Sequence, residues 1–148
     1  MSTEQTAIDV RKVEAFTNAV IGDVGAAMAA ALVSIGDELG LYRTMADSRP
    51  VTPADLAART GTAERYVREW LNVQAAGGWV DYDPATRAYT LPPEHAACVT
   101  DEQSPMFLLG AFDFAATAWP DRDAVLHAFR TGEGIGWHQH DARLYTGT

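Results

Sequence analysis

The side chains with the most reactive chemistry lie in two short stretches of the sequence. In the first, Cys98 follows His95 by three residues, a spacing that places two side chains next to each other on a helix. A thiol beside an imidazole can act as a nucleophile, but the neighbouring sequence supplies no third orienting group and no oxyanion-binding device. We therefore interpret Cys98 as a core residue, and we predict no catalytic residue in this chain.

The second stretch, residues 138–141, contains two histidines and an aspartate and is similar to a metal-binding tract. Histidines two residues apart share a face only in a strand, and a zinc site needs a third or fourth ligand. The other candidate ligands, His95, His127 and Cys98, are not spaced as ligands. The sequence therefore predicts no metal site.

Glycines at 132, 134 and 136 form the one glycine cluster of the sequence. A glycine-rich cofactor loop follows a strand, opens a helix and belongs to a βαβ unit of about 30 residues. Here the glycines follow a predicted helix, and no such unit remains after them. We interpret them as a helix cap and linker, and we expect no cofactor-binding residue in this chain.

Composition and charge limit the class of protein and its partners. The chain has 148 residues, 47% of them hydrophobic, with one cysteine and a net charge of −9. This length predicts one domain with its own core, and the lone cysteine fits a reducing compartment. The first twelve residues lack the pattern of a signal or transit peptide, and the longest apolar run, residues 24–33, is too short to span a bilayer. We therefore expect a cytoplasmic protein that does not bind membranes.

The elements that position these residues begin with a long apolar stripe. Apolar side chains recur every three or four residues and predict one long helix or two abutting ones: Val13, Phe16, Val20, Val24, Met28, Ala31, Ile35, Leu39 and Tyr42. Gly22, Gly25 and Gly36 lower the helix propensity, which indicates a break or a close approach by another backbone. Small residues at 25–31 fit either an alanine-rich core or a self-association surface.

Residues 50–91 contain the parts of a winged helix-turn-helix. Thr52 and Asp55 mark the start of one helix, and Gly61 marks its end. Thr62 caps a second helix that ends at 77–78, with the apolar face Tyr66, Val67, Trp70, Leu71 and Val73. Residues 79–91 predict a β-hairpin with its turn at 83–86. Further helices are predicted at 93–99, 105–118 and 121–130, and no regular period follows residue 134.

We therefore predict a mainly α fold, namely a winged helix-turn-helix with a small β-hairpin wing and long flanking N- and C-terminal helices. Its second helix occupies the position that reads DNA in such folds. Arg65 and Arg68 are interleaved there with Glu64 and Glu69, and residues 50–90 carry four arginines against five acids. A binder of nucleic acid needs a basic surface, so we expect no nucleic-acid partner.

Four segments carry a resemblance to a known family: GAAMAAALVSIGDELGLYRTMA, TPADLAARTGTAERYVREWLNVQAAGGWVDYD, YTLPPEHA and GEGIGWHQHDARLYTGT. They resemble the N-terminal region of a bacterial family of class I S-adenosylmethionine-dependent methyltransferases. In that family this region dimerises and covers the substrate pocket, while a Rossmann-like catalytic domain follows it and binds S-adenosylmethionine. The resemblance implies a part of a longer enzyme or a shortened product, and we expect this chain alone to be inactive.

The resemblance also implies a division of the chain and a set of contact residues. Residues 1–12 are expected to be a flexible N-terminus, residues 13–131 the winged-helix dimerisation domain, and residues 132–148 a linker toward an absent catalytic domain. Trp137 and His140 match a stretch that lines the substrate pocket, for which an ordinary linker with exposed histidines is the alternative. For the expected homodimer, the interface candidates are Val24, Ala27, Met28 and Ala31.

A second function stays open at this point. A stand-alone winged-helix protein that regulates transcription or binds a small ligand has the same predicted elements. The charge of the separate segments, such as residues 50–90, favours the methyltransferase domain over the regulator. In the full-length protein, we expect this domain to contact a small-molecule substrate.

Overall fold

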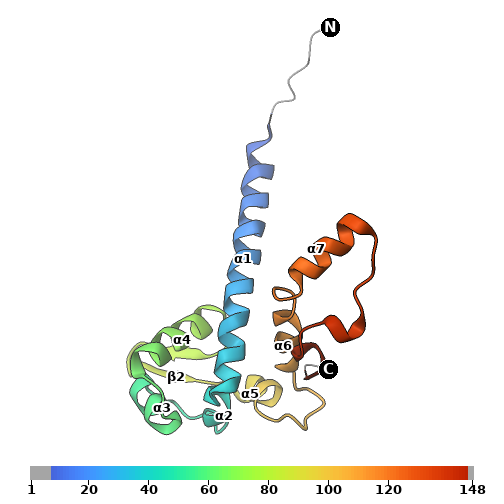
Figure 1. Cartoon of the computed structure of the whole chain (residues 1–148). Helices are drawn as coiled ribbons and strands as arrows, with labels where there is room; N and C mark the ends of the chain where they lie inside the picture. Colours follow the sequence, from blue (N-terminus) through green and yellow to red (C-terminus); the bar gives the residue numbers. More distant parts are fainter. Residues whose placement is uncertain (1–7, 147–148) are drawn as a thin grey trace.

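A computed structural model describes residues 8–146 and shows a mainly helical chain with one small antiparallel sheet (Figure 1). The predicted fold class, a winged helix-turn-helix with long flanking helices, is confirmed. The elements are α1 (Val10–Glu38), α2 (Leu41–Thr44), α3 (Pro53–Thr60), α4 (Glu64–Ala76), β1 (Asp81–Asp83), β2 (Ala88–Thr90), α5 (Pro93–Val99), α6 (Gly110–Ala116), α7 (Arg122–Thr131), the 3-10 turn η1 (Trp137–Gln139) and α8 (Arg143–Thr146).

The helix-turn-helix forms through the local signals that the sequence contains. The Thr52 hydroxyl accepts a hydrogen bond from the Asp55 backbone at 3.2 Å and caps α3. Gly61 ends α3 with a φ of 66°, a left-handed conformation that glycine adopts without strain. β1 pairs with β2 so that Tyr82 lies opposite Tyr89, and the turn lies at the predicted place. α4 begins two residues after the predicted cap, with Ala63 at the N-cap and no side-chain capping bond.

The core lies between the last turns of α1, helices α2 to α5 and strand β2. At its centre the Tyr42 hydroxyl donates a 2.8 Å hydrogen bond to the Gln74 side-chain oxygen, so two buried polar groups satisfy each other. The predicted apolar face of α4 is only partly buried. Val67, Trp70 and Leu71 enter the core, whereas Tyr66 and Val73 are exposed beside α1.

Helix α1 begins at Val10, three residues earlier than predicted, because the Asp9 carboxylate accepts a hydrogen bond from the Arg11 backbone. Residues 10–12 are therefore helical, and residues 1–7 of the expected flexible N-terminus lie outside the described residues. The helix runs without a break to Glu38 and projects beyond the winged part (Figure 1). Gly22 and Gly25 thus cause no break, and only Gly36 meets a close neighbour, the Trp70 indole.

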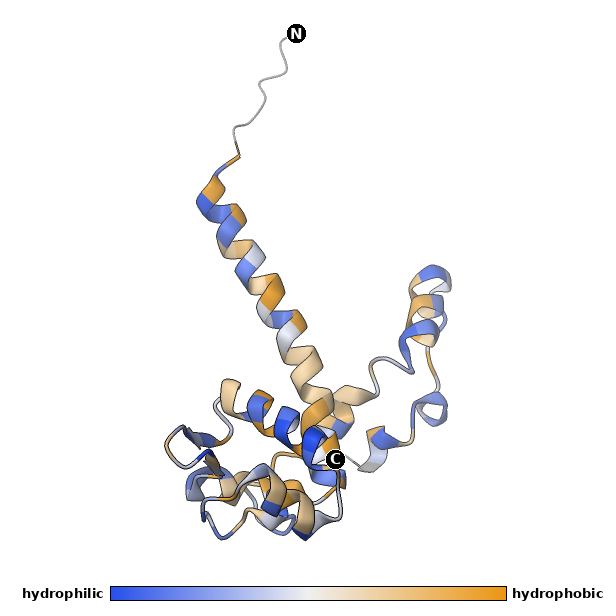
Figure 2. Ribbon diagram, turned by 90° about the vertical axis from the view of Figure 1, so that its left-hand side faces the viewer, coloured by the Kyte–Doolittle hydropathy of each residue, from blue (hydrophilic) through white to orange (hydrophobic). Residues whose placement is uncertain are grey.

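The predicted apolar stripe of α1 faces away from the core. Val33 and Gly36, which lie off the stripe, are the buried residues of α1. The large stripe residues of α1 are 43–72% exposed, and apolar bands recur along the projecting half of the helix (Figure 2). The stripe's last residue, Tyr42, belongs instead to α2 and is buried.

Helix α1 is also long and apolar enough to cross a membrane, with a mean hydropathy of 1.8 over its most apolar 18 residues. The apolar segment is therefore longer than the run at 24–33 suggests, because Val20, Ile21 and Ile35 extend it on both sides. Only 11% of that window is buried. Membrane spans and helices that pack on protein share this length and composition.

The chain after the wing departs from prediction in two places. The helix predicted at 105–118 begins only at Gly110, because the Leu108 backbone bonds back to the Cys98 carbonyl at 2.9 Å and bends the segment. Residues 132–148, predicted as a linker, contain η1 and α8. Helix α8 packs on α6 through Leu144, which is 7% exposed, so this segment is folded onto the domain.

Candidate functional site

The two predicted substrate-lining residues lie together at the start of the folded C-terminal segment. The rings of Trp137 and His140 meet edge to face, with their centroids 5.9 Å apart. Tyr145 packs on Trp137 with centroids 5.5 Å apart, and its hydroxyl donates to the Trp137 carbonyl oxygen. Trp137 is mostly exposed, while most of the His140 side chain is covered.

Asp121 fixes His140 in place. Its Oδ2 is 2.7 Å from His140 Nδ1, and its Oδ1 accepts a 3.0 Å hydrogen bond from the Asp141 backbone. Both side chains are largely buried, with 13% of Asp121 and 21% of His140 exposed. Sequence reasoning placed Asp121 only at the start of a helix. No local signal reveals a pair whose members are 19 residues apart.

A groove of about 470 Å³ lies beside this pair, between α6, α7 and α8. His140 lines the groove but Trp137 does not, so only one of the two predicted residues reaches it. Apolar side chains make most of the wall, and the lining residues are Phe114, Ala115, Thr117, Ala118, Asp121, Arg122, Val125, His140 and Leu144. The volume of the groove lies in the range of small-molecule sites.

The start of α8 is anchored next to the groove. Arg143 donates from Nε and Nη2 to the two oxygens of Asp141, at 2.8 and 3.1 Å. These side-chain hydrogen bonds, with one from the Arg143 backbone, lower the pKa of Asp141 to about 2. Asp141 therefore stays ionised at neutral pH, and it connects η1 to α8.

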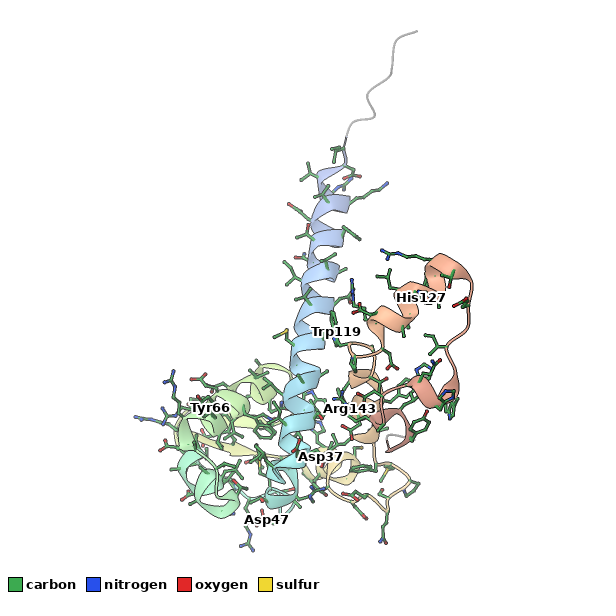
Figure 3. All side chains as sticks on the ribbon, in the orientation of Figure 1. Asp37, Asp47, Tyr66, Trp119, His127 and Arg143 are labelled. Carbon is green, nitrogen blue, oxygen red and sulfur yellow. The ribbon has the colours of Figure 1, made fainter. Side chains whose placement is uncertain are left out.

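A second apolar surface is formed by α1 and α4. The four predicted interface residues, Val24, Ala27, Met28 and Ala31, are all exposed on α1. Below them a groove of about 490 Å³ separates α1 from α4. Its walls include Leu32 and Ile35 of α1, Leu39 directly after α1, and Tyr66, Trp70 and Val73 of α4. This groove and the one at His140 lie on different elements, and Tyr66 and His127 appear on opposite sides of α1 in Figure 3.

The outer face of α4 carries compensated charge. Arg68 bonds to Glu64 one turn away, as in the solvated, salt-bridged face that the sequence predicts. Arg65 and Glu69 are exposed on the same helix. The position that reads DNA in other winged helices therefore presents both signs of charge.

Cys98 and His95 do not form a reactive pair. His95 Nδ1 bonds to the Trp79 carbonyl oxygen at 2.9 Å, and Cys98 is partly buried against the core. Within residues 8–146, no three His, Cys, Asp or Glu side chains gather as metal ligands. That the protein binds no metal stays a prediction.

The winged part of the chain matches a known protein family. A family profile described as "Rv2258c-like winged HTH domain" matches residues 26–101. Comparison of the sequence with curated proteins gives no match.

Several solved structures with a similar fold are described as methyltransferases. The mitomycin 7-O-methyltransferase MmcR is 24% identical over 85% of this chain and 37% of its own, with a TM-score of 0.68. An O-methyltransferase family protein from Burkholderia thailandensis is 15% identical, with 96% and 41% covered and a TM-score of 0.64. Human N-acetylserotonin methyltransferase, solved in complex with SAM, is 13% identical, with 91% and 38% covered and a TM-score of 0.62. At these identities the similarity shows the fold, and this chain spans about two fifths of their length.

Proposed function

We propose, from the premise that this chain belongs to the family of Rv2258c-like winged helix-turn-helix domains, that it is the dimerisation and substrate-covering domain of a small-molecule methyltransferase. The exposed stripe of α1 is the observation that carries the proposal. S-adenosylmethionine would bind to a catalytic part outside this chain, since residues 8–146 include no strand that runs into a glycine-rich turn and helix.

The projecting part of the stripe needs a partner because its side chains are largely exposed in a single chain. Burial of one valine, phenylalanine or methionine side chain contributes about 1.5–3 kcal/mol. Val13, Phe16, Val20, Val24 and Met28 are all exposed on one side of α1. A second copy presents the same stripe, so a two-fold dimer covers both at once.

A protein partner suits α1 better than a lipid bilayer. Asp23 lies near the middle of the apolar part of the helix. An aspartate at the centre of a bilayer costs about 2.5–3.5 kcal/mol, whereas at the edge of a helix pair it remains in water. The proposed dimer therefore covers the apolar side chains and leaves Asp23 solvated.

Charged substitutions in the stripe test the dimer. Ala27→Glu and Ala31→Glu place a carboxylate on the proposed interface, and we expect both variants to sediment as monomers at tens of micromolar, where the unaltered chain is a dimer. Ala58→Glu adds the same charge on the exposed side of α3 and serves as the matched control. A monomer for the unaltered chain contradicts the proposed dimer.

The substrate-covering role is supported by the groove at α6, α7 and α8. Its lining includes His140, a residue that the sequence already connects with the substrate pocket. Because the chain spans about two fifths of the similar methyltransferases, the groove would close one side of a pocket whose remainder belongs to the catalytic part. A regulator that binds DNA is the second candidate, and the mixed charge of α4 does not favour it.

A further inference from the structure

We propose that the Asp121–His140 pair is a hydrogen-bond acceptor for the hydroxyl group of a neutral, phenol-type ligand in the groove between α6, α7 and α8. The inference rests on the proposed substrate-covering function and states which chemical class that side of the pocket recognises. It follows from the direction of the hydrogen bonds, from the lining of the groove and from its charge.

The direction of the hydrogen bonds determines what His140 offers to a ligand. An ionised carboxylate only accepts hydrogen bonds, so Nδ1 of His140 must donate to Asp121 across the 2.7 Å contact. In the neutral imidazole the other nitrogen, Nε2, is then an acceptor. Within residues 8–146 no hydrogen bond to Nε2 is formed, so this nitrogen is available to a donor group.

The position of the imidazole ring is fixed before any ligand binds. Asp121 is itself held, because its second oxygen accepts from the Asp141 backbone at 3.0 Å. Trp137 packs edge to face on the ring of His140. An acceptor that is held in this way loses little conformational entropy on binding, which favours affinity.

The groove walls select an apolar ligand body. Phe114, Val125 and Leu144 face the same space as His140, and the volume of about 470 Å³ lies in the usual range for small-molecule sites. A flat aromatic ring fills such a space, and its hydroxyl group supplies the hydrogen that His140 accepts. Phenols combine these two properties.

The charges around the groove exclude an anionic ligand. Asp121 contributes a carboxylate, and the one cationic lining residue, Arg122, is paired with Asp123 at 2.8 Å. The Asp121 carboxylate would therefore repel a carboxylate or phosphate group next to His140. A neutral hydroxyl group meets no such repulsion.

Two matched probes test the proposal on the full 148-residue chain. 2-Naphthol carries the hydroxyl group, and 2-methoxynaphthalene has a similar apolar body without a hydrogen to donate. By calorimetry we expect 2-naphthol to bind about 10-fold more tightly, the factor that corresponds to one net hydrogen bond of about 1.4 kcal/mol. Equal affinities, or no binding of either probe, overturn the proposal.

Substitution of His140 assigns that preference to one atom. His140→Phe keeps an aromatic ring but has no acceptor, so the variant should bind the two probes with equal affinity. His138→Phe makes the same change at an exposed neighbour outside the groove lining and should retain the 10-fold preference. A preference that survives in His140→Phe contradicts the assignment.

A measurement on the unaltered chain covers the case in which a variant does not fold. Nitrogen NMR of the histidine rings should show the hydrogen of His140 on Nδ1, and 2-naphthol should shift the Nε2 signal while 2-methoxynaphthalene does not. A hydrogen on Nε2 overturns the proposal. The sedimentation experiment tests the proposed dimer independently of the phenol site. A chain that is a dimer but binds both naphthalene probes equally refutes only the phenol site.

Discussion

Trp70 packs closely against the backbone of α1, and a glycine allows this contact. Its Nε1 donates a 2.8 Å hydrogen bond to the Leu32 carbonyl oxygen of α1. A Cβ atom at Gly36 would lie 2.5 Å from the indole Cζ2, a distance that no real contact tolerates. The absence of a side chain at Gly36 therefore brings α4 against α1.

Gly36→Ala should destabilise the protein by about 1–3 kcal/mol, because the added methyl group forces the buried indole to move. Gly22→Ala is the matched control, since no atom lies within 4 Å of its Cβ. Alanine is the better helix former, so this control should stabilise α1 by about 0.5–1 kcal/mol. Urea denaturation measures both changes, and a shift in the same direction for both variants contradicts the packing argument.

The buried Tyr42 makes the free energy of unfolding depend on pH in the alkaline range. Burial, and to a lesser degree the charge of Asp37, raises the pKa of Tyr42 above its ordinary value of 10.0. The unfolded chain therefore loses this proton first as the pH rises. The contribution of the Tyr42 hydroxyl to the free energy of unfolding is therefore complete below pH 10 and falls above pH 10.

Tyr42→Phe should cost about 1–3 kcal/mol at pH 7, since it leaves the buried Gln74 oxygen without its donor. Between pH 9 and pH 11 the difference between the unaltered chain and the variant should shrink by about 1.4 kcal/mol. Urea denaturation at the three pH values checks this. A difference that stays constant with pH refutes the coupling to Tyr42.

Among contacts between single residues, the sequence predicts only those whose partners are close together in the chain. Thr52 and Asp55 are three residues apart, and their capping geometry follows from helix chemistry alone. Asp121 and His140 come together only after α7 and the turn that follows it bring the chain back. Spacing contains no information about such a contact, so the sequence indicated His140 and missed Asp121.

The helices illustrate a different limit of sequence reasoning. The three- and four-residue period correctly predicts that α1 is a helix with one apolar side. It does not tell whether that side faces the core of the same chain or another surface, because burial against either one produces the same pattern. The residues through which α1 enters the core, Val33 and Gly36, are less conspicuous than the large exposed ones.

Helix α8 shows how a short element can go unpredicted. It has four residues, too few for a period to be recognised, and its position depends on the burial of Leu144 against α6. The segment that contains it was therefore expected to be a linker. The structure makes it part of the groove wall.

Leu144→Asp should detach this segment. The loss of a buried leucine costs about 2–5 kcal/mol, and a carboxylate in its place adds desolvation. We expect trypsin to cleave after Arg130 and Arg143 at least 10-fold faster, while the winged core stays resistant. Ala142→Asp, at an exposed neighbour, should leave the cleavage rate unchanged. Equal rates for the two variants show that α8 contributes no packing.

On the scale of the whole molecule, charge decides between the roles that a winged helix can have. The fold is shared by DNA readers and other domains, so fold alone does not assign a function. The net charge of −9 opposes the approach of a polyanion, and Arg68 on α4 already pairs with Glu64.

Duplex DNA should therefore show no specific binding, even at about 50 mM salt, where phosphate contacts are strongest. A selection from random duplexes, followed by footprinting, is the measurement. The regulator function replaces the proposed one if a defined sequence emerges and its binding disappears in the Arg65→Ala, Arg68→Ala double variant.

The proposed dimer makes the order of the projecting half of α1 depend on protein concentration. Residues 10–28 are all exposed and so have almost no tertiary contacts in one chain, and an isolated helix of this length is marginal in water. When two copies meet, the same association that covers the stripe also completes the helix. Folding of this segment is then a bimolecular event, and the amount of protein that a cell makes determines how much of it is ordered.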